Sequence, residues 1–465
     1  MLLRVKMKEN EQYKRLIRLI MVVVLIAAEM TMYYWIWLEY YNELMQIPYD
    51  VKGNYAIAFV YGLIIFLLLR IYGGFRIGYL KAVNLIYSHI LSIVCANVII
   101  YIQEILIIKR MPSPAPLIFL TVLESVLVVI WSMASTRIYR KLYPSKRVVL
   151  IYGDRPVSML KQKLHTREDR FQVCESIHIS EGKENIQKKI KKYEGVVIGD
   201  IPANIRNQIL KFCYGEGIRT YTMPKISDIL IRSAESLHIF DTPLLLSRNI
   251  GLTAEQKVIK RMLDIVGSVC ALFITSPVMI LTMCAIKLYD RGPVFFTQDR
   301  CTQNGRIFKI YKFRSMIVDA EKDGKPIPAT QKDPRITPIG SLIRATRIDE
   351  LPQFFNILKG DMSLVGPRPE RVEHVEKYTK EIPEFGYRMK VKGGLTGYAQ
   401  VYGKYNTTAY DKLKLDLMYI ENYSILLDIE IIFNTLKILL MKESTEGFTE
   451  ENSKAMSGNE DGEKS

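Results

Sequence analysis

The sequence predicts a membrane protein of three parts: a bundle of four transmembrane helices, a small α/β domain, and an α-rich monotopic domain with a re-entrant membrane helix. Three observations predict it. Four long apolar runs come first, a soluble segment of short alternating stretches follows, and a fifth apolar run opens a region dense in polar clusters. The expected ranges are 1–140, 146–249 and 255–442, with the re-entrant helix at 262–288 and a disordered tail at 443–465.

The net charge limits the classes of partner that this protein is expected to bind. The 465 residues carry 64 Lys and Arg against 48 Asp and Glu, a net charge of +16. Such an excess suits nucleic acid, anionic lipid or a phosphorylated substrate. We expect no nucleic-acid partner, because no DNA- or RNA-binding motif accompanies the charge. The six cysteines form no CxxC or His-paired spacing, which argues against a disulfide framework and a zinc ribbon.

Each of the first four apolar runs is long enough to cross ~30 Å of hydrocarbon. Lys and Arg gather before the first run, in the second loop and after the fourth run. The positive-inside rule then places both ends of the bundle in the cytoplasm. Lys109 and Arg110, in a loop expected outside, do not fit this rule but are outnumbered. Glu29 and Glu124 lie inside runs; they are either functional or, as we favour, packed or snorkelling. The runs are 19–38, 53–69, 82–103 and 117–136.

A fifth apolar run, 265–286, has no charged residue but basic residues on both flanks. A helix that crossed the membrane would place one of those flanks outside. Ser276-Pro277 lies in its middle, where proline removes a helix hydrogen bond and the serine hydroxyl can satisfy the freed backbone. These facts favour a helix that enters, bends and returns to the same face. The alternative is a fifth span kinked by proline.

The middle segment, 146–249, has the sequence pattern of alternating strands and helices that is typical of βαβ units. The stretches 147–153 and 195–199 are typical of buried strands, and 186–193 has helical character. We therefore predict a Rossmann-like parallel α/β domain. Gly153 is followed by Asp154-Arg155-Pro156 and lacks the further glycines of a GxGxxG loop. A structural or regulatory role is favoured over a dinucleotide site.

The densest polar cluster contains Asp349 and Glu350, followed by Leu351 and Pro352. This order is typical of a helix start, since Asp is a favoured N-cap and Pro suits the first turn. One interpretation is capping alone. The other is an aspartyl nucleophile beside a metal or base carboxylate. Nearby arginines shift the balance to the second, because guanidinium groups commonly bind phosphate oxygens. They are Arg344, Arg347 and Arg368, the last held in the rigid stretch Gly366-Pro-Arg-Pro369.

This region resembles the bacterial sugar transferases, the polyprenyl-phosphate hexose-1-phosphate transferases. The first 250 residues resemble, by architecture, the large subgroup that initiates exopolysaccharide or capsule synthesis. The matching motifs, in family order, are Lys260-Arg261 with Asp264, Ser276-Pro277, Gly292-Pro-Val-Phe-Phe-Thr-Gln298, Lys312-Phe-Arg-Ser-Met316, Asp349-Glu-Leu-Pro-Gln353, Gly360-Asp-Met-Ser-Leu-Val-Gly-Pro-Arg-Pro369 and Gly394-Leu-Thr-Gly-Tyr-Ala-Gln400.

The resemblance implies an enzyme that transfers a hexose 1-phosphate from a UDP-sugar to undecaprenyl phosphate and releases UMP, with Mg²⁺ as cofactor. Asp349 matches the nucleophile that forms a phosphosugar–aspartyl intermediate, and Glu350 the neighbouring acid associated with the metal, so both are candidate metal ligands. The candidate phosphate-binding residues are Arg344, Lys312, Arg314 and Arg368. For Lys312 and Arg314 the alternative is a solvated basic face against anionic lipid.

The resemblance also implies an inner-membrane protein with its catalytic domain on the cytoplasmic face, and it leaves a homodimer open. The sequence departs from the family at Gly393 and Tyr398, where Pro and Trp are usual, and at Tyr402, where Asn is common. These changes put the sugar in doubt, not the reaction. The stretch 423–441 is either an amphipathic surface helix or a core helix. Two other functions stay open: a membrane-anchored nucleotide sensor, and an assembly scaffold without turnover.

Overall fold

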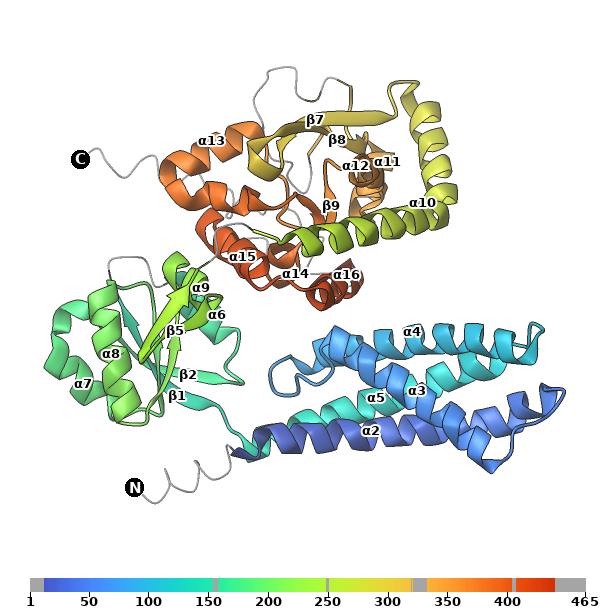
Figure 1. The fold of residues 1–465 in the computed structure, drawn as a ribbon, viewed down its shortest axis with the longest axis horizontal. Coiled ribbons are helices and arrows are strands. Elements are labelled where there is room, and N and C mark those ends of the chain that lie inside the picture. The colour runs from blue at the N-terminus through green and yellow to red at the C-terminus, as the bar shows by residue number, and fades with distance from the viewer. Residues whose placement is uncertain are drawn as a thin grey trace. The chain divides into compact units, whose positions relative to one another are not determined.

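The structure is a computed structural model that describes residues 12–153, 158–247, 251–318, 320, 333–403 and 407–439. Helices form at all four apolar runs, and each is long and apolar enough to cross a membrane. They pack as a bundle (Figure 1). Asp50 starts the second helix by accepting a 2.9 Å hydrogen bond from the Gly53 amide. The helices are α2 (Lys14–Ile36), α3 (Val51–Tyr72), α4 (Ala82–Ile108) and α5 (Ala115–Leu142), with the turns η1 (Trp37–Tyr41) and η2 (Asn42–Leu44) after α2.

The bundle has a polar interior. Glu29 and Glu124 are both 0% exposed, so neither carboxyl snorkels to the membrane surface. A third carboxyl, Glu104 of α4, is equally buried. Trp37 donates a 2.8 Å hydrogen bond to Asn54, which ties η1 to α3. Buried intramembrane carboxyls are rare in such bundles, because each must find polar partners or stay neutral.

The segment after the bundle folds as an α/β domain around a four-stranded parallel sheet of order β2-β1-β3-β4. The strands expected at 147–153 and 195–199 are confirmed as β1 and β3; the central residues of β1, 148–151, and all of β3 are buried. β2, which pairs with β1, was not expected from the sequence, because its residues alternate between exposed and half-buried and form no long apolar run. The elements are β1 (Lys146–Tyr152), α6 (Ser158–His165), β2 (Phe171–His178), η3 (Ile179–Glu181), α7 (Lys183–Ile190), β3 (Gly195–Ile198), α8 (Ala203–Gly215) and β4 (Arg219–Thr222).

The chain divides into two compact units between Pro224 and Lys225, ahead of the boundary expected at residues 249–255. The reason is α9 (Ile226–Arg232), whose Ile226 and Ile229 belong to the core of the C-terminal unit. A two-stranded antiparallel hairpin follows, made of β5 (Glu235–Ile239) and β6 (Thr242–Leu246).

The fifth apolar run forms α10 (Ala254–Asp290), a helix with Pro277 in its interior. Figure 1 shows its ribbon changing direction sharply along its length. Proline has no amide hydrogen to donate to the carbonyl four residues earlier, which is that of Phe273. Ser276 Oγ donates to this same carbonyl at 2.9 Å, as expected from the sequence. The bend therefore leaves no unsatisfied carbonyl at Phe273.

Both arms of α10 pack against the same C-terminal unit. Leu272, before the bend, contacts the core cluster of Phe308 and Ile357. Met279 and Ile286, after the bend, belong to the adjacent cluster around Phe313. The remaining elements are β7 (Phe295–Cys301), η4 (Gln303–Gly305), β8 (Ile307–Phe313), α11 (Pro338–Ala345), η5 (Ile348–Glu350), α12 (Gln353–Lys359), β9 (Ser363–Val365), α13 (Val372–Glu381), η6 (Pro383–Lys390), β10 (Gly394–Thr396), α14 (Tyr398–Tyr402), α15 (Ala409–Glu421) and α16 (Ile425–Leu439).

The helix expected at 423–441 is α16, and it combines the two alternatives. Ile431 is buried in the core, whereas Leu426, Leu436 and Leu439 are exposed. One face therefore packs inward and the other presents leucines outward. The expected disordered tail, 443–465, lies outside the described residues.

Candidate active site

Asp349 and Glu350 lie in a short 3₁₀ turn, η5, between α11 and α12. The preceding Arg347 has a φ of 59°, in the left-handed region, which turns the chain sharply after α11. The helix start expected at Asp349 is therefore wrong in position: α12 begins at Gln353, and Pro352 is its N-cap residue. Asp349 is consequently not a capping residue, and its carboxyl is available for other chemistry.

Glu350 is held by two cations. Lys312 Nζ lies 3.0 Å from Glu350 Oε1, and Arg368 Nη2 lies 2.5 Å from the same oxygen. Burial alone raises the pKa of Glu350, but Arg368 and Lys312 outweigh it and hold that pKa well below its usual range. Glu350 is therefore ionised at neutral pH. Both cations are candidate phosphate-binding residues by sequence, and the structure places them at Glu350.

Asp349 is more isolated. Its side chain is buried, and burial raises its pKa above the usual range, with Lys312 as the largest opposing influence. The positive charge of Arg344, in the last turn of α11, also lowers this pKa, whereas the charge of Glu350 raises it. The two adjacent carboxyls thus have pKa values displaced in opposite directions. Such a split is typical of functional carboxylate pairs.

Arg314, the fourth candidate for phosphate binding, has a different partner. It forms an ion pair with Asp290, at the C-terminal end of α10, and its side chain is 7% exposed. This pair fixes the end of α10 to the segment after β8. The pairs that the structure gives to Glu350 come from Lys312 and Arg368, so Arg314 stands apart from them.

Two arginines outside the predicted set, the buried Arg388 and the partly buried Arg300, fix the backbone that carries Arg368. Arg388 Nη2 donates to the carbonyl of Arg368 at 3.0 Å, and Arg300 Nη1 donates to that of Pro369 at 3.2 Å. Gly366 starts this stretch where a side chain would collide with the Lys392 carbonyl. The sequence alone did not indicate Arg388 or Arg300, because both act on backbone atoms that are distant in the chain.

Asn356 is a second residue that the sequence analysis missed. Its side chain is fully buried in α12 and bonds to β8 twice: it donates to the Lys309 carbonyl at 2.8 Å and accepts from the Tyr311 amide at 2.9 Å. These bonds fix β8, and hence Lys312, beside the turn that carries Glu350. An amide side chain one turn into a largely apolar helix was the available signal.

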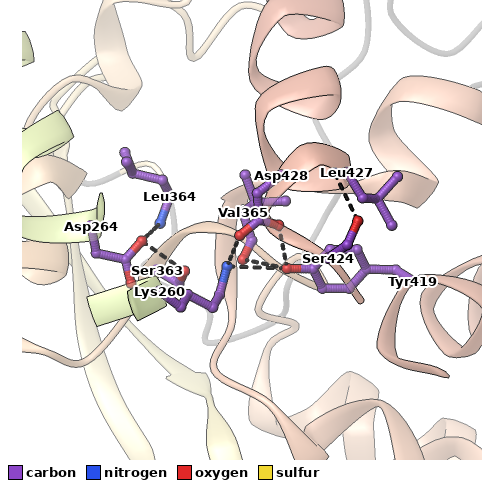
Figure 2. Close-up of polar contacts among 9 residues, drawn as sticks. All are labelled: Lys260, Asp264, Ser363, Leu364, Val365, Tyr419, Ser424, Leu427 and Asp428. Atoms are coloured by element: carbon purple, nitrogen blue, oxygen red, sulfur yellow. Dashed lines mark hydrogen bonds and ion pairs between the residues drawn. The ribbon is translucent and has the colours of Figure 1, made fainter. Parts of the chain in front are cut away.

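A buried network connects α10 to the strand that leads into this site (Figure 2). Lys260 Nζ donates to Asp428 of α16 at 2.6 Å, and Tyr419 Oη donates to the other oxygen of Asp428 at 2.8 Å. One turn along α10, Asp264 accepts from the Ser363 hydroxyl at 2.9 Å and from the Leu364 amide at 2.8 Å. β9 is thus fixed to α10 directly before the stretch that carries Arg368.

The sequence that forms this site is similar to that of known proteins. Residues 255–442, which contain every site residue named above, match the family model described as bacterial sugar transferase. A UDP-glucose:undecaprenyl-phosphate glucose-1-phosphate transferase of Caulobacter vibrioides is 38% identical over 191 residues, which cover 71% of that protein and 40% of this chain. The chain belongs to the bacterial sugar transferase family.

Other relatives of this bacterial sugar transferase are longer than the part that matches. A UDP-N-acetylgalactosamine-undecaprenyl-phosphate N-acetylgalactosaminephosphotransferase of Aeromonas hydrophila is 40% identical over 255 residues, 54% of this chain and 59% of that protein. The galactosyl transferase CpsE of Streptococcus agalactiae is 47% identical over 195 residues, 40% of this chain and 42% of that protein. The chain thus spans about half the length of these curated relatives. Their names specify different sugars.

Proposed function

We propose that this chain transfers a hexose 1-phosphate from a UDP-sugar to undecaprenyl phosphate, releasing UMP, as the first membrane step of exopolysaccharide or capsule synthesis. The observation that carries the proposal is the buried pair in η5, where Asp349 lies beside a Glu350 that two cations hold ionised. Membership of the family and the activities printed in its relatives' names support it.

The proposed chemistry has two displacements at phosphorus. The Asp349 carboxylate attacks the β-phosphorus of the UDP-sugar; an Asp–O–P bond forms, the bond to the bridging oxygen breaks, and UMP leaves. A phosphate oxygen of undecaprenyl phosphate then attacks the same phosphorus and displaces Asp349. A covalent intermediate suits two substrates that arrive from different phases, water and lipid. The burial of Asp349 supports this role, since desolvation makes a carboxylate more reactive.

The charges around the pair support binding of a diphosphate. Arg368 and Lys312 present positive charge on one side of Glu350, and Arg344 acts on Asp349 from α11. Guanidinium groups pair well with phosphate oxygens. These residues would orient the β-phosphate toward the Asp349 carboxylate.

The donor set at the pair also fits Mg²⁺. Among the described residues no three His, Cys, Asp or Glu side chains gather as a metal cluster. Mg²⁺ in phosphoryl-transfer sites is commonly held by one or two carboxylates together with substrate phosphates and waters, so two carboxyls suffice. Both cation contacts to Glu350 use Oε1, and Asp349 is adjacent, so these two residues would hold the ion. When bound, Mg²⁺ would neutralise charge on the diphosphate.

We further propose that α10 is re-entrant. The site then lies at the inner membrane and faces the cytoplasm, the compartment that contains UDP-sugars. The packing of both arms of α10 on one unit supports this. A helix that crossed ~30 Å of hydrocarbon would carry its second arm away from that unit. Exposed apolar side chains on both arms, among them Phe273 and Leu281, fit contact with lipid.

The all-parallel sheet of order 2-1-3-4 supports a Rossmann-like arrangement for the α/β domain. We assign this domain a structural or regulatory role. The reaction proposed above needs only residues of the C-terminal unit.

The decisive experiment uses membranes that contain the full chain, incubated with a panel of UDP-sugars and undecaprenyl phosphate. Mass analysis of the lipid fraction should find one undecaprenyl-diphospho-sugar, with UMP formed in equal amount. Without the acceptor, the protein mass should rise by one sugar phosphate, mapped to the peptide of Asp349. Binding of a UDP-sugar without lipid product or UMP would favour a sensor instead.

The topology is tested by single cysteines, after the native cysteines are replaced. Lys377→Cys, on the exposed side of α13, should be shielded from an impermeant thiol reagent in intact cells. Gln46→Cys, in the loop expected outside, should be labelled. Replacing Ser276 and Pro277 with Leu and Ala should straighten α10, expose position 377 and remove activity. Labelling of Lys377→Cys in otherwise unaltered intact cells would contradict the re-entrant arrangement.

A further inference from the structure

The transmembrane bundle contains a polar cluster that the proposed reaction does not use. Its carboxyls come from three helices: Glu29 from α2, Glu104 from α4 and Glu124 from α5, all 0% exposed. Tyr33 and Tyr61 lie between them, with their rings stacked at a centroid distance of 4.3 Å. The four helices thus enclose this polar cluster within a membrane-spanning bundle.

Glu29 and Glu124 differ in their hydrogen bonds. Tyr61 donates to Glu124 Oε1 at 2.5 Å, and Asn97 donates to Glu124 Oε2 at 3.1 Å. Neither oxygen of Glu29 has a hydrogen-bond partner among the described residues. Donors to both oxygens suit the ionised form of Glu124. A carboxyl buried in an apolar bundle without any donor is stable only when it is neutral or binds a cation.

The surroundings of Glu29 favour a proton over a metal ion. Its charged neighbour is Glu124, which repels a second negative charge. No cation is among the groups that act on Glu29. The buried His89 of α4 lies against the Gly74 carbonyl and the ring of Trp131 instead. Three metal-ligating side chains do not gather anywhere in the described part of the chain. The groups that face the cluster are Tyr33 and Tyr41 on α2 and η1, Tyr61 on α3, Glu104 on α4 and Glu124 on α5.

We propose that the bundle has a proton-binding site at Glu29, next to Glu124, whose two oxygens both accept hydrogen bonds. This proposal is independent of the transferase activity. Further polar groups continue from Glu29 toward the end of the bundle formed by η1 and the α4–α5 loop. Tyr33, one turn after Glu29, donates to Glu104 at 3.4 Å, and Tyr41 donates to the Ser113 carbonyl at 3.0 Å. The proton exchanges with water at that end through these groups.

Infrared difference spectroscopy on the full-length protein in lipid nanodiscs tests the proposal. At neutral pH the protein should show the carbonyl stretch of a protonated carboxyl, which shifts when heavy water replaces water. Glu29→Gln should remove the part of this band that belongs to Glu29, and Glu104→Gln measures any part from Glu104, whose Oε2 also lacks a hydrogen-bond partner among the described residues. Glu124→Gln should retain it, and so should Glu39→Gln, a matched change at an exposed glutamate after α2.

Exchange through the polar groups is tested by its rate. Tyr33→Phe and Glu104→Gln should keep the band but slow its shift in heavy water at least several-fold. A band that is absent from the unmodified protein, or that is equally strong in Glu29→Gln, would overturn the site. Loss of the band on addition of Na⁺ or K⁺ would also overturn it, because it would show a metal-cation site. An unchanged exchange rate in both variants would overturn the exchange route.

Discussion

Two pairs of carboxyls in this molecule are built in opposite ways. In the C-terminal unit, Glu350 is held by Lys312 and Arg368 beside Asp349. In the bundle, Glu124 is held by the neutral donors Tyr61 and Asn97 near Glu29, with no described cation. Cations keep charge in the first pair, where the proposed phosphorylated substrate would need it. Neutral donors permit a single charge in the second pair, as an apolar bundle requires.

The effect of burial on a carboxyl depends on the charges around it. Asp349 and Glu29 are both buried members of a pair, and each lies beside a better-supported carboxyl. The nearby cations limit the burial effect on Asp349, so it can still ionise. For Glu29 nothing described offsets burial. Five substitutions test this comparison, in order of expected effect.

Asp349→Asn should have the largest effect. An amide cannot attack phosphorus, so turnover should fall on the order of 10⁴-fold or more, as for other covalent nucleophiles. The fold should be kept or stabilised: burial raises the pKa of Asp349, so ionising it opposes folding at neutral pH. Lipid-product formation and thermal unfolding measure the two effects. A folded and fully active Asp349→Asn protein would contradict the covalent mechanism.

Glu350→Gln should come second, with a rate loss of about 10²–10³-fold. The amide leaves Lys312 and Arg368 without their anion and removes one proposed Mg²⁺ ligand. The Mg²⁺ concentration that gives half-maximal rate should rise. Glu373→Gln, on the exposed side of α13, is the matched control and should behave as the unmodified protein. An unaltered Mg²⁺ response in Glu350→Gln would remove this residue from the metal site.

Lys312→Gln should shift the pH dependence of the rate. Asp349 must be ionised to react, so kcat/KM falls as the pH drops through its pKa, which burial raises above the ordinary ~3.9. Lys312 is the largest influence that lowers this pKa. Its removal should therefore move the acid limb of the profile to higher pH, beyond any loss in maximal rate. If the acid limb stays in place, Asp349 is not the group that sets it.

The membrane pair should give the smallest effects. Glu124→Gln presents an amide to the donor Asn97, so the free energy of unfolding should fall by roughly 1–3 kcal/mol. Glu29→Gln replaces a carboxyl that has no donor and should change stability by less than about 0.5 kcal/mol. Thermal unfolding in detergent compares the two. Equal losses in both variants would remove the distinction drawn between these carboxyls.

Much of this architecture follows from local sequence patterns. Apolar length located α2 to α5, the Ser276-Pro277 pair located the bend in α10, and turn-bounded apolar runs located β1 and β3. The two carboxyls and the cations Lys312 and Arg368 followed from motif chemistry. Positions set by distant contacts did not follow from it: β2 lacks a continuous apolar run, and α9 packs on the C-terminal unit.

In the candidate site, too, positions that depend on distant contacts could not be predicted from local sequence patterns. Arg388 and Arg300 bind backbone carbonyls of the stretch after Gly366, and Asn356 joins α12 to β8. Such residues have no local signature, because their partners are brought to them only by the fold. The position of Asp349 in a 3₁₀ turn depends on the left-handed Arg347, a conformation that sequence patterns rarely indicate outside glycine and asparagine.

The bond between Lys260 and Asp428 joins residues that are 168 positions apart. Because a ribosome adds about 5–20 residues per second, α10 is made on the order of ten to thirty seconds before α16 can reach it. During that interval α10 has its apolar surface and Lys260 without the helix that later packs on them. Early insertion into lipid, or protection by a chaperone, would bridge this delay. Without such protection, a nascent chain stalled before residue 428 should leave α10 open to proteases.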